Sequence, residues 1–183
     1  MSAEGLHKGE EMKILLLAVA VVVILLLAAL TYLGMFSSLK LEEREMGPYP
    51  FVYTQEPSTD FGKIGRLTKA LGDRLETAGV TDRKPAQLYY PVGRGIQNQI
   101  GCVVDRAVGP EVLGAETFFR PIPAQRYVVA QFPFHNPLSF IVGYFRVDPA
   151  FKEYRKAKGL PESSAMVILD GDTIVYLQPL GQD

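Results

Sequence analysis

The chain of 183 residues has little of the material from which common functional sites are built. It contains one cysteine, Cys102, which excludes an intrachain disulfide and a multi-thiolate metal site. Because Cys102 lies in an apolar pattern typical of a strand, we interpret it as a buried, inert thiol. The formal net charge is −1, so there is no basic excess to neutralise phosphates, and nucleic acid is not expected as a partner.

Histidine is also scarce, and only His135 lies outside the N-terminal tail. A Ser-His-Asp set can be written from Ser139, His135 and Asp148, but His135 precedes the expected helix and no strained nucleophile turn is present. One histidine cannot build a metal site, and no acidic pair stands at ligand spacing. Gly93-Arg94-Gly95 precedes a strand, which indicates a hairpin rather than a dinucleotide site. We therefore expect no enzyme activity, no metal and no cofactor.

The chain does contain one long uncharged run. Residues 14–33 read ILLLAVAVVVILLLAALTYL, and the next charged residue is Lys40. Twenty helical residues at about 1.5 Å each span about 30 Å, the thickness of the hydrocarbon core of a bilayer. A cleaved signal peptide is the alternative, but its apolar core usually has only about 7–15 residues. We predict a tail at 1–13 and a transmembrane helix at 14–36 that anchors the chain in the lipid bilayer.

Basic residues are balanced on the two sides of this run, with Lys8 and Lys13 before it and Lys40 and Arg44 after it. The positive-inside rule therefore gives only a slight preference for a cytosolic C-terminal domain. Residues 37–50 are expected to form a stalk, in which 39–46 could continue as two helical turns until the prolines at 48 and 50 stop the helix. A soluble domain at 51–183 follows.

The first half of this domain predicts a β-α-β-β unit. A strand at 51–56 precedes a helix whose apolar positions recur every three or four residues from Phe61 to Ala78. Further strands are expected at 86–90 and 99–105, rich in β-branched or aromatic residues.

The second half repeats this order. A strand at 127–132 precedes a helix from 138 that restarts at Asp148-Pro149, and strands follow at 165–169 and 174–180. FVYTQEP in the first half aligns with YVVAQFP in the second, which supports duplication. We predict an α+β fold in which duplicated β-α-β-β units form one antiparallel sheet with two helices on one face, plus the N-terminal transmembrane helix.

The sheet face without helices would form a groove between the two repeats. Alternation along the strands places small residues such as Val52 and Val128 under the helices and sends their larger or polar neighbours to the groove. The predicted lining residues are Tyr53, Tyr90, Tyr127, Val167 and Tyr176, with Gln55 and Gln131 as hydrogen-bonding groups. A concave surface of aromatics and a few amides is typical of a small-molecule pocket. Alternatively, these aromatics cap the core against the segment 106–124.

The ordered segments resemble the GyrI-like (gyrase-inhibitor-like) effector-binding domain. The likeness rests on RYVVAQFPFH at 126–135, VDPAFKEYRKAKGL at 147–160 and MVILDGDTIVYLQPL at 166–180. The resemblance implies binding of a hydrophobic, often cationic small molecule, or of a protein, between the repeats. It also implies an acidic ligand contact on the third strand of the second unit, where Val167 stands. Valine can neither attract a cation nor act as a general base, so the chain departs from the family pattern here.

Three functions follow from the sequence. The first is a membrane-anchored domain that binds a small apolar or amphipathic molecule. The second is a membrane-tethered adaptor that binds a protein segment through the same surface or by strand addition to a sheet edge. The third and least favoured is a small-molecule hydrolase, which would depend on Glu116 entering the groove.

Overall fold

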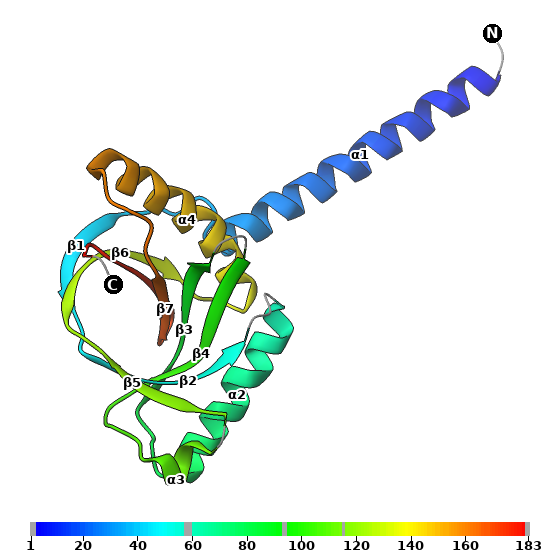
Figure 1. The fold of residues 1–183 in the computed structure, drawn as a ribbon. Helices are drawn as coiled ribbons and strands as arrows, with labels where there is room; N and C mark the ends of the chain where they lie inside the picture. Colours follow the sequence, from blue (N-terminus) through cyan, green and yellow to red (C-terminus); the bar gives the residue numbers. More distant parts are fainter. Residues whose placement is uncertain (1–2, 57–59, 93–94, 115, 182–183) are drawn as a thin grey trace.

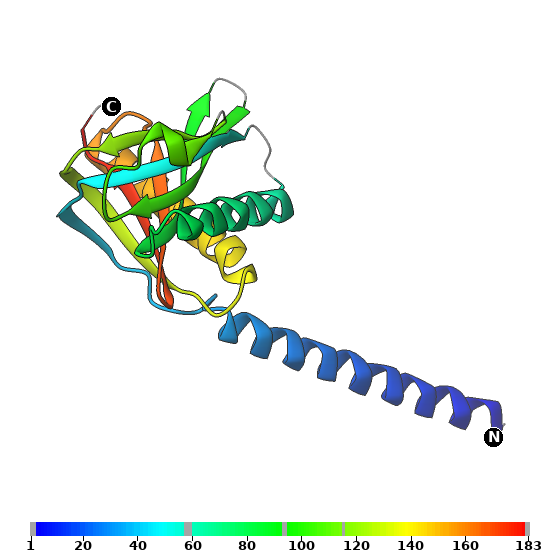
Figure 2. The same ribbon diagram turned by 90° about the horizontal axis from the view of Figure 1, so that it is seen from below.

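A long helix and an eight-stranded antiparallel sheet form most of the structure. The structure is a computed structural model that describes residues 3–56, 60–92, 95–114 and 116–181. Figures 1 and 2 show the long helix projecting from the body that the sheet and the other helices form. Gly93 and Arg94 of the predicted hairpin lie outside the described residues. The elements are α1 (Ala3–Tyr32), β1 (Leu41–Met46), β2 (Tyr49–Glu56), α2 (Phe61–Thr77), β3 (Arg83–Val92), β4 (Gly95–Val104), α3 (Pro110–Leu113), β5 (Phe118–Ile122), β6 (Gln125–Pro133), α4 (Leu138–Lys158), β7 (Ala165–Asp170) and β8 (Thr173–Pro179).

α1 is long and apolar enough over Met12–Tyr32 to cross a membrane, and the side chains of this span are exposed. The helix ends where Gly34 adopts a positive φ of 84°. There the amides of Gly34 and Met35 donate to the carbonyls of Thr31 and Leu30, both at 3.0 Å. This pair of bonds is a Schellman-type end, for which glycine is the preferred residue.

The segment expected to form a stalk is part of the sheet. β1 pairs antiparallel with β6, with Leu41 opposite Ala130 and Met46 opposite Gln125, so the helical continuation predicted for 39–46 is wrong. The strand is held from outside as well, because Glu43 accepts a hydrogen bond from the Tyr154 hydroxyl. Pairing with β6 satisfies backbone groups that a helix of only two turns would leave partly unpaired.

The predicted duplication is confirmed by the strand order β1-β6-β8-β7-β3-β4-β2-β5. One unit is β2-α2-β3-β4, the other is β6-α4-β7-β8, and the two meet where β3 pairs with β7. The strand that precedes each unit joins the opposite unit: β1 pairs with β6, and β5 pairs with β2. The α+β class with one antiparallel sheet is therefore confirmed, and the two edge strands are additions that the sequence did not predict.

α2 and α4 cover the same face of the sheet, which we call the convex face. Leu75 of α2 packs with Val52, and Phe151 of α4 packs with Val128 and Ala130. These small strand residues lie under the helices, as alternation predicted.

α4 is one continuous helix, so the predicted restart at Asp148-Pro149 is wrong. Pro149 is exposed, so the hydrogen bond that it cannot donate is missing on the solvent side. Val147 and Phe151 on either side of the proline stay buried on the convex face, and their packing maintains the helix across it.

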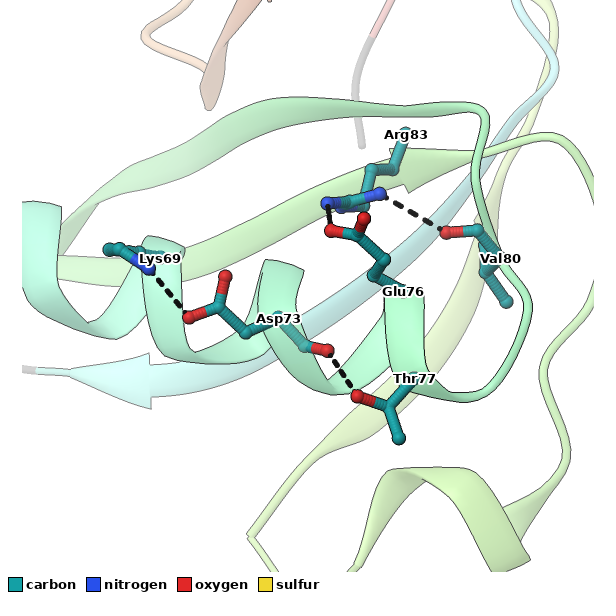
Figure 3. A network of polar contacts seen from close by, with 6 residues as sticks. All are labelled: Lys69, Asp73, Glu76, Thr77, Val80 and Arg83. Atoms are coloured by element: carbon teal, nitrogen blue, oxygen red, sulfur yellow. Dashed lines mark hydrogen bonds and ion pairs between the residues drawn. The ribbon is translucent and has the colours of Figure 1, made fainter.

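Side chains hold the turn from α2 into β3 (Figure 3). Arg83 at the start of β3 forms an ion pair with Glu76 at 2.5 Å and donates to the Val80 carbonyl oxygen at 3.4 Å. Lys69 and Asp73 pair at 2.7 Å earlier on the same helix. The contacts of Arg83 fix the start of β3, including Lys84, which belongs to the candidate site.

The opposite, concave face has no helix over it. The sheet curls so that side chains from seven of its strands, β2 to β8, pack against one another across this face, and Phe51 and Leu177 are fully buried there. The segment 106–124 does not plug the face, because β5 extends the sheet at its edge and contributes only Ile122 to the buried cluster. The centre of the concave face is thus filled by its own side chains, and a cavity opens toward one of its margins.

Candidate functional site

A row of aromatic rings crosses part of the concave face. The rings of Phe51 and Tyr53 stack with centroids 5.3 Å apart, and Phe118 of β5 lies 5.6 Å from Tyr53. The guanidinium of Arg120 stands 5.8 Å from the centroid of the Tyr90 ring, within the range of a cation–π contact. Tyr53 and Tyr90 are only half-buried, so this row is accessible at its margin.

Strand register shows where the predicted site residues lie. Tyr53 and Tyr90 border the concave cluster, Tyr127 is part of it, and Gln55 and Gln131 fall on the same face by alternation. The other two lie on the convex face, because Val167 and Tyr176 pair with each other and pack in the α4 cluster. Both are buried under α4, and Tyr176 donates to the Phe140 carbonyl oxygen at 3.4 Å. Their predicted position in the groove is therefore corrected.

The position of Val167 on the convex face changes what this residue implies about a ligand. A residue at this place points toward α4, so neither an acid nor a valine here would contact a ligand on the concave face. The absence of an acid at 167 is therefore no argument about the ligand's charge.

One polar group of the concave face is conspicuous. Gln99, opposite Gln55 and Leu88 in the sheet, is 7% exposed, and its Oε1 atom has no hydrogen-bond partner in the part of the chain that the structure describes. A buried acceptor without a partner costs about 1–3 kcal/mol. A donor group on a bound molecule would remove this cost.

A cavity of about 340 Å³ opens at the other margin of the concave face. Its volume falls at the lower end of the range usual for small-molecule sites. Apolar side chains form its floor and charged ones its rim; it is lined by Met46, Tyr49, Asp82, Lys84, Val103, Val104, Asp105, Ile168, Asp170 and Val175.

The rim of this cavity is acidic. Its described lining includes three carboxylates, Asp82, Asp105 and Asp170, and one cation, Lys84, whose Nζ lies 2.9 Å from Asp170 Oδ2. Burial is the main reason why the pKa of Tyr49 is raised, with smaller contributions from Tyr127 and Asp170. The Tyr49 phenol is thus neutral near pH 7 and keeps a proton to donate. The cavity combines an apolar floor, one hydroxyl and excess negative charge.

A smaller cavity of about 220 Å³ lies along β1 and β6. It is lined by Ser38, Lys40, Glu42, Arg44, Val129 and Gln131. Gln131 is the one predicted site residue that lines either cavity. The lining of the larger cavity escaped the sequence analysis because it comes from strand ends distant in the chain, and alternation alone does not bring them together.

The catalytic set considered from the sequence is not assembled. Ser139 is fully buried, and its Oγ accepts hydrogen bonds from the amides of His135 and Asn136 at 3.1 and 3.4 Å. This hydroxyl therefore satisfies backbone amides just before α4 begins. The His135 ring instead stacks on Tyr32, with centroids 4.8 Å apart. Cys102 is buried, and burial raises the pKa of its thiol to about 11. Among the described residues no group of three or more His, Cys, Asp or Glu side chains could hold a metal.

Comparison with known proteins gives the fold. No family model and no curated protein matches the chain. Among solved structures, EcmrR in a complex with DNA has a TM-score of 0.60 at 12% identity, covering 100% of this chain and 73% of that one. The C-terminal domain of EcmrR has a TM-score of 0.55 at 15% identity, with 80% and 98% covered. SAV2435 bound to tetraphenylphosphonium has a TM-score of 0.53 at 10% identity, with 78% and 94% covered. At these identities the likeness shows a shared fold.

Proposed function

We propose that the domain binds a small amphipathic molecule in the 340 Å³ cavity of its concave face. The observation that carries the proposal is the composition of this cavity: an apolar floor that includes Val103, Ile168 and Val175 under an acidic rim. Apolar burial supplies the affinity of such a site, and a few polar groups orient the ligand. Because the rim has more carboxylates than ammonium groups, it favours a ligand that carries a positive charge.

Two further observations bear on this proposal. SAV2435, which shares the fold, is bound to tetraphenylphosphonium, an apolar cation. Among the described residues, the Gln99 Oε1 atom has no partner and offers an acceptor elsewhere on the concave face, outside the lining of this cavity.

Binding can be measured by calorimetry on a fragment that begins at Leu33, which keeps the residues packed against the α4 cluster. Tetraphenylphosphonium is expected to bind the fragment, and tetraphenylborate, of similar shape and opposite charge, to bind more weakly. Met46→Trp, which places an indole ring at the 340 Å³ cavity, is expected to weaken binding strongly. Gln131→Trp, which places one at the smaller cavity, is the matched control and should leave binding unchanged. If neither ion binds a fragment whose circular dichroism is that of a folded protein, the proposal is rejected.

We further propose that α1 anchors the domain in a membrane as a single-pass helix, with the domain on the cytosolic side. The length, apolar composition and exposure of Met12–Tyr32 support this. The chain is expected to stay in the membrane pellet after alkaline carbonate extraction. Protease added to sealed vesicles, with and without detergent, tests the side.

A protein-binding role is the second candidate, and Phe118 favours it. This aromatic is 44% exposed on the edge strand β5, where a peptide strand could add. The sequence also resembles the testis-expressed endoplasmic-reticulum-phagy receptor in Arg146-Val147-Asp148-Pro149-Ala150 and in its membrane helix followed by a GyrI-like domain. A protein recovered from membranes by cross-linking, and lost in Phe118→Glu but kept in Met46→Trp, would favour this role over ligand binding.

A further inference from the structure

α1 ends directly against the domain, without a free linker. The buried Gly34 leaves no room for a side chain, since a Cβ atom there would lie 2.9 Å from Pro133 Cγ and 3.0 Å from Phe132 Cζ. Leu33 and Met35, on either side of Gly34, pack against the convex-face cluster of α4. The position of α1 therefore fixes the position of the domain.

The contacts at this junction come from the beginning of α4. The Tyr32 ring at the end of α1 stacks on His135, just before α4 starts. Arg146 of α4 donates from Nη2 to the Ser37 carbonyl oxygen at 3.0 Å. Both ribbon views show the first turns of α4 beside the end of α1, with its last turns farther away (Figures 1 and 2).

The first turns of α4 present apolar side chains to the outside. Leu138 is 55% and Phe145 66% exposed, and a spacing of seven residues puts them on one side of the helix. Tyr32 and Phe36, at 59% and 63%, are exposed at the adjoining end of α1. Among the residues beyond Phe36 whose side-chain exposure the structure describes, only Phe118 is another exposed large apolar side chain. Such clustering usually marks a contact surface.

The apolar character stops along the helix. On the same side, the next positions after Phe145 are Asp148 and Lys152, which form an ion pair at 2.7 Å. Only the part of α4 near α1 is therefore suited to an apolar environment. A continuous apolar side along the whole helix would instead fit a partner helix.

We propose that Tyr32, Phe36, Leu138 and Phe145, named the junction surface, lie in the boundary between headgroups and acyl chains of the bilayer that α1 crosses. This rests on the proposed anchoring by α1. The occupant is lipid because these side chains adjoin the end of the apolar span, where aromatic residues are most favourable. The domain then lies against the membrane and contacts the bilayer through the first turns of α4.

The absence of tryptophan from the chain permits a direct test. The full chain is placed in phosphatidylcholine nanodiscs with brominated acyl chains, which quench nearby indole fluorescence. Three single-tryptophan variants are compared: Phe145→Trp in the junction surface, Phe118→Trp as the exposed control on β5, and Leu25→Trp in the middle of the apolar run. Leu138→Trp repeats the first measurement on the same side of α4.

Phe145→Trp and Leu138→Trp are expected to show blue-shifted emission and to be quenched most by bromines near the carbonyl end of the acyl chains. Leu25→Trp should be quenched most by deep bromines, and Phe118→Trp by neither. Quenching of Leu25→Trp without quenching of Phe145→Trp and Leu138→Trp overturns the proposal and keeps the anchor. A blue shift at 145 without quenching means that protein, such as a second copy, covers the surface, which also overturns it. If Leu25→Trp is not quenched, the anchor fails and the proposal fails with it.

Discussion

The charge of the cavity rim gives a quantitative prediction about ligand selectivity. Lys84 and Asp170 form an exposed ion pair at the rim, so either charge can be removed without burying the other. Asp170→Asn makes the rim less negative by one unit, and Lys84→Met makes it more negative by one unit. The two variants should therefore shift the affinity for a charged ligand in opposite directions.

The magnitude follows from the size of the cavity. A sphere of 340 Å³ has a radius of about 4.3 Å, so a charge at its centre lies about 6 Å from a rim carboxylate. At this distance and an effective dielectric constant of about 60, two unit charges interact by roughly 0.9 kcal/mol, or about five-fold in affinity. Asp170→Asn should weaken tetraphenylphosphonium binding about five-fold and Lys84→Met should tighten it about five-fold.

Calorimetry with both ions separates charge from structure. Tetraphenylborate should respond with the opposite signs, and the double variant Lys84→Met/Asp170→Asn should bind both ions nearly as the wild type does. The shifts should shrink at high salt, because screening acts over about 10 Å at 0.1 M. If each variant changes the affinity for both ions in the same direction, the electrostatic reasoning is refuted. If neither variant changes it, the ligand does not bind at this cavity.

Three further predictions concern stability and reactivity. Gly101→Ala should lower the free energy of unfolding in urea by about 3 kcal/mol or more, because the new Cβ would lie 1.8 Å from the Val52 carbonyl oxygen; Gly65→Ala, with open space around it, is the control and should add about 0.5–1 kcal/mol. Cys102 should resist alkylation at pH 8 in the folded chain and react at once in denaturant, because the thiol is 1% exposed and its pKa is about 11; fast labelling of the folded chain would contradict its burial. The hydrogen bond from Tyr154 is the main cause that lowers the pKa of Glu43, so this carboxylate stabilises the fold above its unfolded pKa and ceases to do so as pH falls through the folded value. Glu43→Gln should thus be less stable than the wild type at pH 7, and this difference should shrink as pH falls through the lowered folded pKa, whereas Glu45→Gln, on the same strand, should show a smaller difference in thermal melts.

The elements that the sequence predicted correctly are those whose pattern is local. The α2 helix and the strands β2 and β6 have clear periods, and the alternation of Val52 with Tyr53 assigned both residues to the correct faces. The edge strand β1 could not be found this way. Its charged residues are compatible with a helix, and only pairing with β6, 79 to 89 residues later, makes it a strand.

The placement of Val167 and Tyr176 failed for a related reason. β7 consists of consecutive apolar residues, so its sequence has no alternation from which faces can be read. The face of Val167 is set by its pairing with Gln87 of β3, a contact between strands distant in the chain, and with Tyr176 across the β7–β8 hairpin. Aromatic residues on strands with an alternating sequence could be assigned to a sheet face from the sequence. The acidic rim could not be predicted, because its residues come together only in the assembled sheet.

The exchange of edge strands between the two units explains why the cavity lies where it does. If β1 and β5 stayed with their own units, each half could close independently and the halves would meet only where β3 pairs with β7. Because each edge strand crosses to the other half, the chain passes directly from Met46 at the end of β1 to Tyr49 in β2. These two residues therefore come to line the cavity together with Lys84 of β3 and Asp170 of β7. The cavity is thus a product of the duplication itself: it forms where the crossing strand meets the seam between the repeats.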